Sequence, residues 1–351
     1  MKKMITCLLA AVGLAPACAQ QNFEDAGAKE FAELATKSDV VTVDVRTAEE
    51  FAVDHIVGAI NIDMKKRDFM DQIKSAVPAD KTVAVYCRSG RRSHEAAIRL
   101  TFAGYKCVNL AGGILAWKEA GLPVTPGTFE TDTFQTKSGK EVKIHALMHA
   151  SIRMEYDGKE IEIDPVRVLG GRAVDYALMP KADYLLVTHE HQDHFDKEAI
   201  AMLSGEATRV ITNKRCSEML GFGETMANGD KMQICSDITI EAVPAYNTTA
   251  EHLQFHPKGR DNGFVLTIDG LRIYIAGDTE DIPEMSEIKD IDIAFLPCNQ
   301  PYTMTVDQLV NAAKMVKPKV LFPYHYGKTP APLIAKKLRG SGINVRIRQY
   351  Q

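Results

Sequence analysis

The sequence has little excess charge of either sign and few cysteines. Its 351 residues carry 42 Lys and Arg against 46 Asp and Glu, a formal net charge of −4. Because no basic excess is available to neutralise phosphates, we expect no nucleic-acid partner. Seven cysteines are too few for a disulfide scaffold in a chain of this length. The 45% hydrophobic and 25% charged residues are ordinary for a soluble globular protein, and the length predicts two domains.

The N-terminal segment lacks an apolar run long enough to cross a bilayer. Two lysines precede an apolar stretch at residues 4–14, whereas a membrane-spanning helix needs about 20 residues. A basic start, a short apolar stretch and small residues predict a signal peptide, residues 1–19, and an exported protein, periplasmic or secreted. Cleavage after Ala19 would leave a soluble chain that starts at Gln20. Lipidation of Cys18 would instead give a membrane-anchored lipoprotein, the one route by which we expect a membrane partner.

Two stretches with different patterns of predicted strands and helices follow. Residues 25–124 alternate short apolar strands with amphipathic helices, the latter expected at residues 66–76, 93–103 and 114–120, which predicts an α/β domain with a parallel sheet. Prolines and a glycine at residues 122–127 interrupt this pattern and predict a linker at residues 125–130. Asp-Gly turns between apolar strands follow, so residues 131–351 are expected to form a two-sheet core with outer helices.

A cysteine lies between the strand at residues 82–86 and the start of a helix. A thiol at this point faces unpaired backbone N–H groups and the positive end of the helix dipole, which favour the reactive thiolate. The loop residues that follow Cys87 are Arg88, Ser89, Gly90, Arg91, Arg92 and Ser93. Arg92 gives the spacing C-x4-R, one residue shorter than the C-x5-R loop of phosphatases. The smaller loop suits a sulfane sulfur better than a phosphate.

Four segments in order resemble a single rhodanese (sulfurtransferase) domain: residues 43–51, 55–61, 87–93 and 109–117. The resemblance implies that Cys87 is the nucleophile, which takes sulfur from a donor as a persulfide and passes it to a thiol or another acceptor. It also implies that the loop N–H groups and Arg92 hold the anion. Asp44 and Arg46 would be structural supports beside the loop.

A cluster of histidines follows the strand expected at residues 182–188. It reads H-x-H-x-D-H and contains His189, His191, Asp193 and His194. Three histidines and an aspartate within six residues are unexpected by chance in a chain with 10 histidines. Such an arrangement can hold two divalent ions bridged by a water or hydroxide. Further ligands must come from other strand ends, and two candidates are Asp278, after residues 271–275, and His325, after residues 320–324.

Residues 130–351 resemble the metallo-β-lactamase superfamily through these segments and through residues 148–151, 162–165 and 301–305. The branch they resemble includes ascorbate-phosphate lactonases and the phospholipase D that acts on N-acyl phosphatidylethanolamines. The resemblance implies an αβ/βα fold and two metal sites. One metal would be bound by His189 and His191, the other by Asp193, His194 and His325, with Asp278 as the bridge.

The sequence departs from this family at one ligand position. The family usually supplies another histidine after the strand at residues 240–246, where this chain has Asn247. Asparagine is a poor zinc ligand, so something else must complete the first site. His256 is our candidate, as a ligand or a substrate contact, with a structural role as the alternative. His149 would either orient a ligand or serve in packing.

The sequence therefore predicts an exported bifunctional enzyme. Its second domain would use two divalent ions, zinc first and manganese or iron as alternatives, to hydrolyse an ester, lactone, amide or phosphodiester of a small molecule. One alternative is a persulfide dioxygenase with a single iron, held by two histidines and a carboxylate. That family also draws one histidine from the position of Asn247. A second alternative is a non-catalytic sulfur carrier or redox sensor on a metal-binding scaffold.

Overall fold

The structure is a computed structural model that describes residues 23–350. Its contacts divide the described chain into two compact units. The first comprises residues up to 48 together with 59–120, and the second comprises residues 49–58 together with the chain from 121 onward. The predicted signal peptide and Cys18 lie outside the described residues. Within residues 23–350, no helix is both long and apolar enough to span a bilayer.

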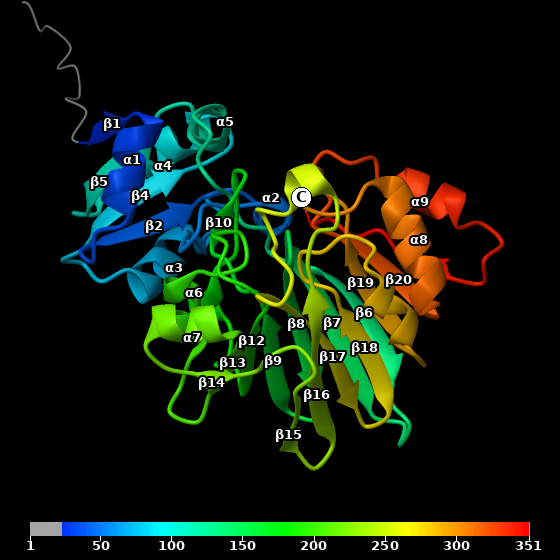
Figure 1. Ribbon diagram of the computed structural model, residues 1–351. Helices are drawn as coiled ribbons and strands as arrows, with labels where there is room; N and C mark the ends of the chain where they lie inside the picture. Colours follow the sequence, from blue (N-terminus) through cyan, green and yellow to red (C-terminus); the bar gives the residue numbers. More distant parts are fainter. Residues whose placement is uncertain (1–22, 351) are drawn as a thin grey trace, which may run out of the picture. The chain divides into compact units, whose positions relative to one another are not determined.

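The first unit is built on one parallel sheet of order β1-β5-β4-β2-β3 (Figure 1). Its strands are β1 (Glu24–Ala26), β2 (Val40–Asp44), β3 (Ile60–Asn61), β4 (Thr82–Tyr86) and β5 (Lys106–Leu110). Its helices are α1 (Ala28–Ala35), α3 (Phe69–Ala76), α4 (Arg91–Phe102) and α5 (Gly113–Glu119). Side chains of β4 alternate between two faces. Val83 and Val85 share a core with α3 and α4, whereas Tyr86 packs against Phe31 of α1, which contacts Trp117 of α5.

A short segment inside the predicted first domain belongs to the second unit. Residues 49–58, which include most of α2 (Ala48–Val53), group with the chain beyond residue 121. His55 and Thr125 exchange two backbone hydrogen bonds of 2.8 and 2.9 Å, and the Gly127 N–H donates to the Ala52 carbonyl. The segment predicted as a linker is therefore packed in its first residues, and Thr125 is buried.

The second unit contains two mixed seven-stranded sheets. In spatial order, the first sheet comprises β14 (Glu224–Thr225), β13 (Arg209–Thr212), β12 (Tyr184–Val187), β9 (Lys159–Ile163), β8 (Ser151–Tyr156), β7 (Glu141–Met148) and β6 (Glu130–Gln135). The second comprises β15 (Lys231–Cys235), β16 (Ile238–Ala245), β17 (Asp261–Ile268), β18 (Leu271–Ile275), β19 (Ile293–Pro297), β20 (Val320–Tyr324) and β21 (Asn344–Val345). A small hairpin pairs β10 (Val168–Leu169) with β11 (Arg172–Ala173).

The main core of this unit lies between the two sheets. Ile144 and Ile161 of the first sheet share one apolar cluster with Phe264 and Ile273 of the second. Helices cover the outer faces: α6 (Lys197–Leu203) and α7 (Lys214–Leu220) on the first sheet, α8 (Val306–Val316) and α9 (Pro332–Lys337) on the second (Figure 1). Short 3-10 turns are η1 (Tyr176–Leu178), η2 (Ala250–His252) and η3 (Pro283–Glu287).

Both parts of the predicted fold class are confirmed: a parallel α/β unit is followed by two packed sheets with outer helices. In the second unit, β9, β12, β18 and β20 end at one edge of the two sheets. The residues that follow these strands include Asp164, His189, Asp278 and His325. Strand direction therefore brings chemically active side chains from distant parts of the sequence to a single edge.

Candidate functional site

Eight histidine and aspartate side chains form two adjoining groups at this edge. Within each group, one ligand atom from every residue lies within 4.8 Å of the others. The first group contains His189, His191, His256 and Asp278. The second group contains His149, Asp193, His194 and His325. Six of these eight were expected as metal ligands from the sequence. Ligation itself stays a prediction.

In the first group, three imidazoles and one carboxylate converge. His189 Nε2 lies 3.2 Å from His191 Nδ1. Asp278 Oδ2 lies 3.4 Å from His256 Nε2 and 3.9 Å from His189 Nε2. All of these residues except His191 are buried. His256, the candidate to complete this site, therefore lies within the first group.

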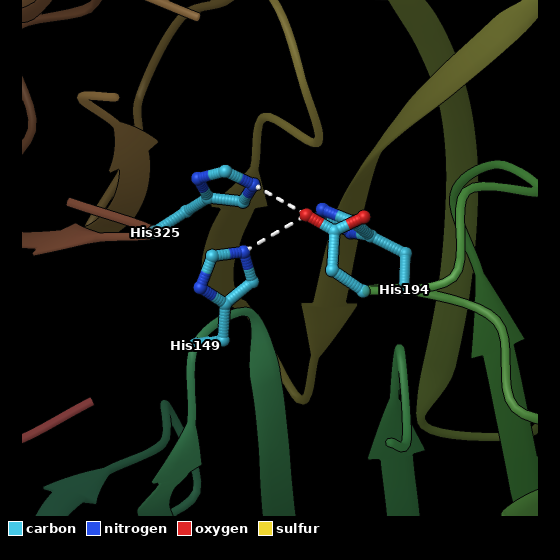
Figure 2. Close-up of side chains that lie close together, drawn as sticks. His149, His194 and His325 are labelled. Carbon is cyan, nitrogen blue, oxygen red and sulfur yellow. Dashed lines mark hydrogen bonds and ion pairs between the residues drawn. The ribbon is translucent and has the colours of Figure 1, made fainter. Parts of the chain in front are cut away.

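In the second group, two imidazoles point at one carboxylate oxygen (Figure 2). Asp193 Oδ2 lies 3.1 Å from His149 Nε2 and 3.3 Å from His325 Nε2. Asp278 also reaches this group, because its carboxylate oxygens lie 3.2 Å from His194 Nε2 and 3.3 Å from His325 Nε2. Asp278 thus stands between the two groups, which is the position expected of a bridging residue.

The residues present fit a pair of divalent cations. Buried polar atoms normally have partners. Among the described residues, four buried atoms that face the groups lie 3.2–3.4 Å from an ion-pair partner but form no well-aligned hydrogen bond: His194 Nε2, His256 Nε2, His325 Nε2 and Asp278 Oδ1. A cation in each group would give these atoms a partner. Imidazole nitrogen with carboxylate oxygen is a donor set that zinc, manganese and iron accept.

In several histidines whose Nε2 faces the metal groups, the second ring nitrogen, Nδ1, contacts a buried oxygen. His194 Nδ1 lies 2.8 Å from Asp164 Oδ2, and His256 Nδ1 lies 3.1 Å from Asp261 Oδ2. His189 Nδ1 lies 3.0 Å from Thr188 Oγ1. Each contact leaves Nε2 free for a metal, as supporting residues commonly do in metal sites. The sequence predicts no individual role for Asp164, Asp261 or Thr188, although Asp164 lies in residues 162–165, one of the segments that resemble the superfamily.

The electrostatics of the groups follow from burial and from the carboxylates. Burial holds the pKa of His189 well below its usual value, which favours the neutral imidazole that binds metals. Burial alone would raise the pKa of Asp278, but the imidazoles of His325 and His194 hold it well below its ordinary range. Asp278 is therefore an anion in a buried site.

Backbone strain accompanies the site. His149, Asp164 and His325 have φ values of 55°, 46° and 47°, a backbone region that residues other than glycine rarely adopt. Gly277, at φ 65°, precedes Asp278, and a Cβ there would lie 2.8 Å from the Asn262 carbonyl oxygen. Three of the seven non-glycine residues with positive φ among the described residues therefore lie in or beside the metal groups.

Asn247 is buried, and its side-chain oxygen has no hydrogen-bond partner among the described residues, whereas its N–H groups are bonded. Its side-chain amide donates to the carbonyls of Tyr302, at 2.9 Å, and His252, at 3.3 Å, while its backbone N–H donates to the His256 carbonyl at 2.8 Å. Glu280 accepts four hydrogen bonds of 2.7–3.0 Å from the backbone and hydroxyls of residues 248 and 249. Together these contacts fold the loop 247–256 back so that His256 faces Asp278.

The first unit holds the predicted sulfur loop. Cys87 follows β4, its side chain is 1% exposed, and Gly90 at φ 86° begins α4. Ser93 Oγ donates to Cys87 Sγ at 3.4 Å. Burial alone would raise the pKa of the Cys87 thiol, but this hydroxyl and the N–H groups of Ser93, Ser89 and Gly90 outweigh it and lower the pKa. The thiolate fraction is therefore larger than for an unperturbed cysteine thiol.

The remaining loop residues differ in exposure. Arg88, Ser89 and Arg91 are exposed, and Arg92 is half-buried. Asp44, the last residue of β2, and Arg46, just beyond it, form a buried ion pair of 2.7 Å. β2 pairs with β4, and a supporting role for both residues stays a prediction. By contrast, Cys107 belongs to the apolar core. Burial raises the pKa of its thiol to about 12, which disfavours the reactive thiolate.

Comparisons with known proteins agree with both units. Residues 27–120 match the rhodanese-like domain, and residues 143–325 match the beta-lactamase superfamily domain. A UPF0173 metal-dependent hydrolase of Ligilactobacillus salivarius is 35% identical over 191 residues, 52% of this chain and 84% of that protein. One of Nanoarchaeum equitans is 30% identical over 204 residues, 54% of this chain and 86% of that protein.

Solved structures add to this likeness. A crystal structure of a candidate metal-dependent hydrolase from Parabacteroides distasonis is 52% identical, with a TM-score of 0.62, and covers 64% of this chain and 100% of that one. Igni18, a metallo hydrolase from Ignicoccus hospitalis, is 26% identical with a TM-score of 0.51 and covers 59% of this chain and 94% of that one. The chain carries an N-terminal rhodanese-like domain and belongs to the beta-lactamase superfamily.

Proposed function

We propose that the second unit binds two divalent ions, zinc first among them, and hydrolyses a small-molecule substrate. The observation that carries this proposal is the pair of adjoining groups that meet at Asp278. Within the described part of the chain, several of their buried nitrogens form no hydrogen bond. Relatives named as metal-dependent hydrolases support it. An ester or lactone, as in the lactonase-like branch, is the substrate class that we propose first.

The chain's own residues would bind the metal ions, orient the imidazoles and leave one side of the site open to substrate. Bound divalent ions supply Lewis-acid polarisation and a water nucleophile near neutral pH. Asp261 and Asp164 orient His256 and His194 toward the centre. The Asp193 carboxylate is 32% exposed, against 7% and 1% for His149 and His325. The substrate would therefore approach from the side of Asp193.

Metal analysis of the purified chain tests this proposal. We expect two zinc or manganese ions per chain, and hydrolysis of at least one member of a panel of esters, lactones, amides and phosphodiesters. His191→Ala and Asp193→Ala should each lose metal and hydrolysis but keep sulfur transfer. Normal metal content in both variants would refute the ligand assignment. A single iron with oxygen uptake on glutathione persulfide would instead establish the dioxygenase reading.

We further propose that the first unit is a sulfurtransferase. The lowered pKa of Cys87 and its position at the start of α4 support this role. The Cys87 thiolate would attack the sulfane sulfur of thiosulfate. As the new S–S bond forms, the S–S bond of thiosulfate breaks, and its electron pair leaves with sulfite. A thiol or cyanide would then attack the outer sulfur of the persulfide and release the thiolate.

Transfer of sulfur from thiosulfate to cyanide tests the role of Cys87. Cys87→Ser should abolish the reaction while metal content and hydrolysis remain at the unmodified level. Full activity of this variant would remove Cys87 from the mechanism. If the unmodified chain showed no turnover with any sulfur donor, the carrier or sensor alternative would be favoured.

Export remains our proposal as well, since residues 1–19 lie outside the described residues. Mass spectrometry of the mature protein from the native cell envelope tests it. A chain that begins at Gln20 would establish cleavage after Ala19, and a lipid on Cys18 would establish the lipoprotein. An unprocessed cytoplasmic chain would refute export.

A further inference from the structure

The segment after β21, residues 346–350, connects the two sheets of the second unit. Its start is held on the second sheet, where the Arg346 N–H donates to the Leu321 carbonyl of β20 at 2.8 Å. Its arginines are held on the first sheet, because Asp132 of β6 lies 2.8 Å from Arg346 Nη1 and 2.7 Å from Arg348 Nη2. We call residues 346–350 the strap.

The strap ends at the second metal group. The carbonyl of Tyr350 accepts a 2.7 Å hydrogen bond from the backbone N–H of His149. The carbonyl of Arg348 accepts a 2.6 Å bond from the hydroxyl of Tyr326, the neighbour of His325 in the chain. The ring of Tyr350 is 1% exposed and packs against Tyr324, the other neighbour of His325.

These contacts fall on the two strained histidines. His149 and His325 both have positive φ, and their rings lie 3.7 Å apart, centroid to centroid. The His325 N–H donates to the His149 carbonyl at 3.1 Å. A relay therefore runs from the Tyr350 carbonyl through the His149 peptide to the His325 peptide. Strained conformations persist only when their surroundings fix them.

From these contacts we infer that the strap is a positioning element for the second metal site. It holds His149 and His325 so that their Nε2 atoms face Asp193. No hydrogen bond joins residues 346–350 to His189, His191 or His256 among the described residues, so the first site does not depend on the strap directly. The inference rests on the proposed two-metal function.

Three variants test the strap. Asp132→Asn weakens its arginine anchor, Tyr326→Phe removes its bond beside His325, and a chain that ends at Val345 lacks it altogether. Asp307→Asn is the matched control, because it breaks a 2.7 Å ion pair with Lys337 on α9. Circular dichroism would report folding, and zinc titration with a competing chelator would give both affinities. Cobalt substitution would report the ligand geometry of each site through its visible absorption.

We expect the variants of Asp132 and Tyr326 to lose about 10- to 100-fold in affinity at one site, as when supporting residues of metal sites are removed. The other site and the control should be unchanged. Unchanged affinities in Asp132→Asn and Tyr326→Phe, or an equal loss at both sites, would overturn the strap's role. If the shortened chain does not fold, these two variants alone decide the question. An unmodified chain that binds fewer than two ions would instead refute the two-metal proposal.

Discussion

Replacing Asp261 by asparagine is expected to weaken the first metal site about tenfold and leave the second nearly intact. Asp261 Oδ2 lies 3.1 Å from His256 Nδ1, and both side chains are fully buried. The carboxylate fixes which ring nitrogen faces Asp278 and increases the basicity of that nitrogen. The substitution keeps the shape of the side chain but removes its charge.

The expected loss of metal affinity depends on the hydrogen bond that the asparagine side chain can still make to His256. Removing an outer partner of a metal ligand commonly costs about 10- to 100-fold in affinity. The asparagine oxygen can still accept a hydrogen bond from His256, although a bond to a charged acceptor is roughly twice as strong. The loss should therefore lie near the lower limit, about tenfold or about 1.4 kcal/mol. Asp261→Ala, which leaves no acceptor, should approach about 100-fold.

Arg260 gives a reason to measure folding alongside metal affinity. Its guanidinium makes two bonds of 2.7 and 2.8 Å to the Asp261 carboxylate, and Nη1 lies 3.5 Å from Glu190 Oε1. Once Asp261 is neutral, Glu190 remains as a counter-charge, so the fold should survive. Asp292→Asn is the matched control, because Asp292 accepts bonds from Arg272 and Lys319 outside the metal groups.

Isothermal titration of the metal-free protein with zinc would give the two affinities. Two ions per chain with one affinity lowered about tenfold would support the assignment of His256 to the first site. Equal weakening of both sites would mean that Asp261 acts through the fold. Wild-type affinity at both sites in Asp261→Ala would refute His256 as a ligand.

Three further outcomes are expected. The pH profile of Cys87 alkylation should have its midpoint below that of free cysteine, about 8.5, because the thiolate persists to lower pH, and Ser93→Ala should move it upward; an unchanged midpoint would exclude the hydroxyl as a cause. Gly113→Ala should abolish sulfur transfer or unfold the first unit, since a Cβ there would lie 2.4 Å from the Cys87 carbonyl oxygen; normal activity would contradict the close approach. Gly277→Ala should lower the free energy of unfolding by at least about 1–2 kcal/mol, the cost of a left-handed residue with a Cβ. It should also reduce metal content by shifting Asp278, and calorimetry and metal analysis would check the two effects.

Some strands were predicted with the correct bounds, whereas β12 and β16 differ from the expected 182–188 and 240–246 by one or two residues at each end. The bounds of β4, β18 and β20 agree with the sequence prediction because apolar runs in a sheet core are continuous. The helix expected from residue 66 begins at Phe69, since turns occupy the residues before it. The helix expected from residue 93 begins at Arg91, because Gly90 adopts a left-handed conformation that starts the helix early.

The metal site was predictable where its residues are close in sequence. The H-x-H-x-D-H string places four of the eight side chains in one loop, so local spacing suffices. His256 could be proposed but not assigned, because its position depends on how Asn247 and Glu280 fold the loop back. For His149 the sequence predicted only a supporting or packing role, whereas the structure places it in the second group. Its backbone conformation depends on the carbonyl of Tyr350, which is distant in the sequence.

The second metal group has a consequence for the cohesion of the unit. His149 and His325 come from opposite sheets and from near the two ends of this unit's sequence. An ion held between them would act as a cross-link that closes a long loop of chain. At a free concentration of 100 times its dissociation constant, such an ion adds about 2.7 kcal/mol to the folded state. The supply of metal would then govern how readily this edge opens to proteases, whereas the apolar layer between the sheets would persist without it.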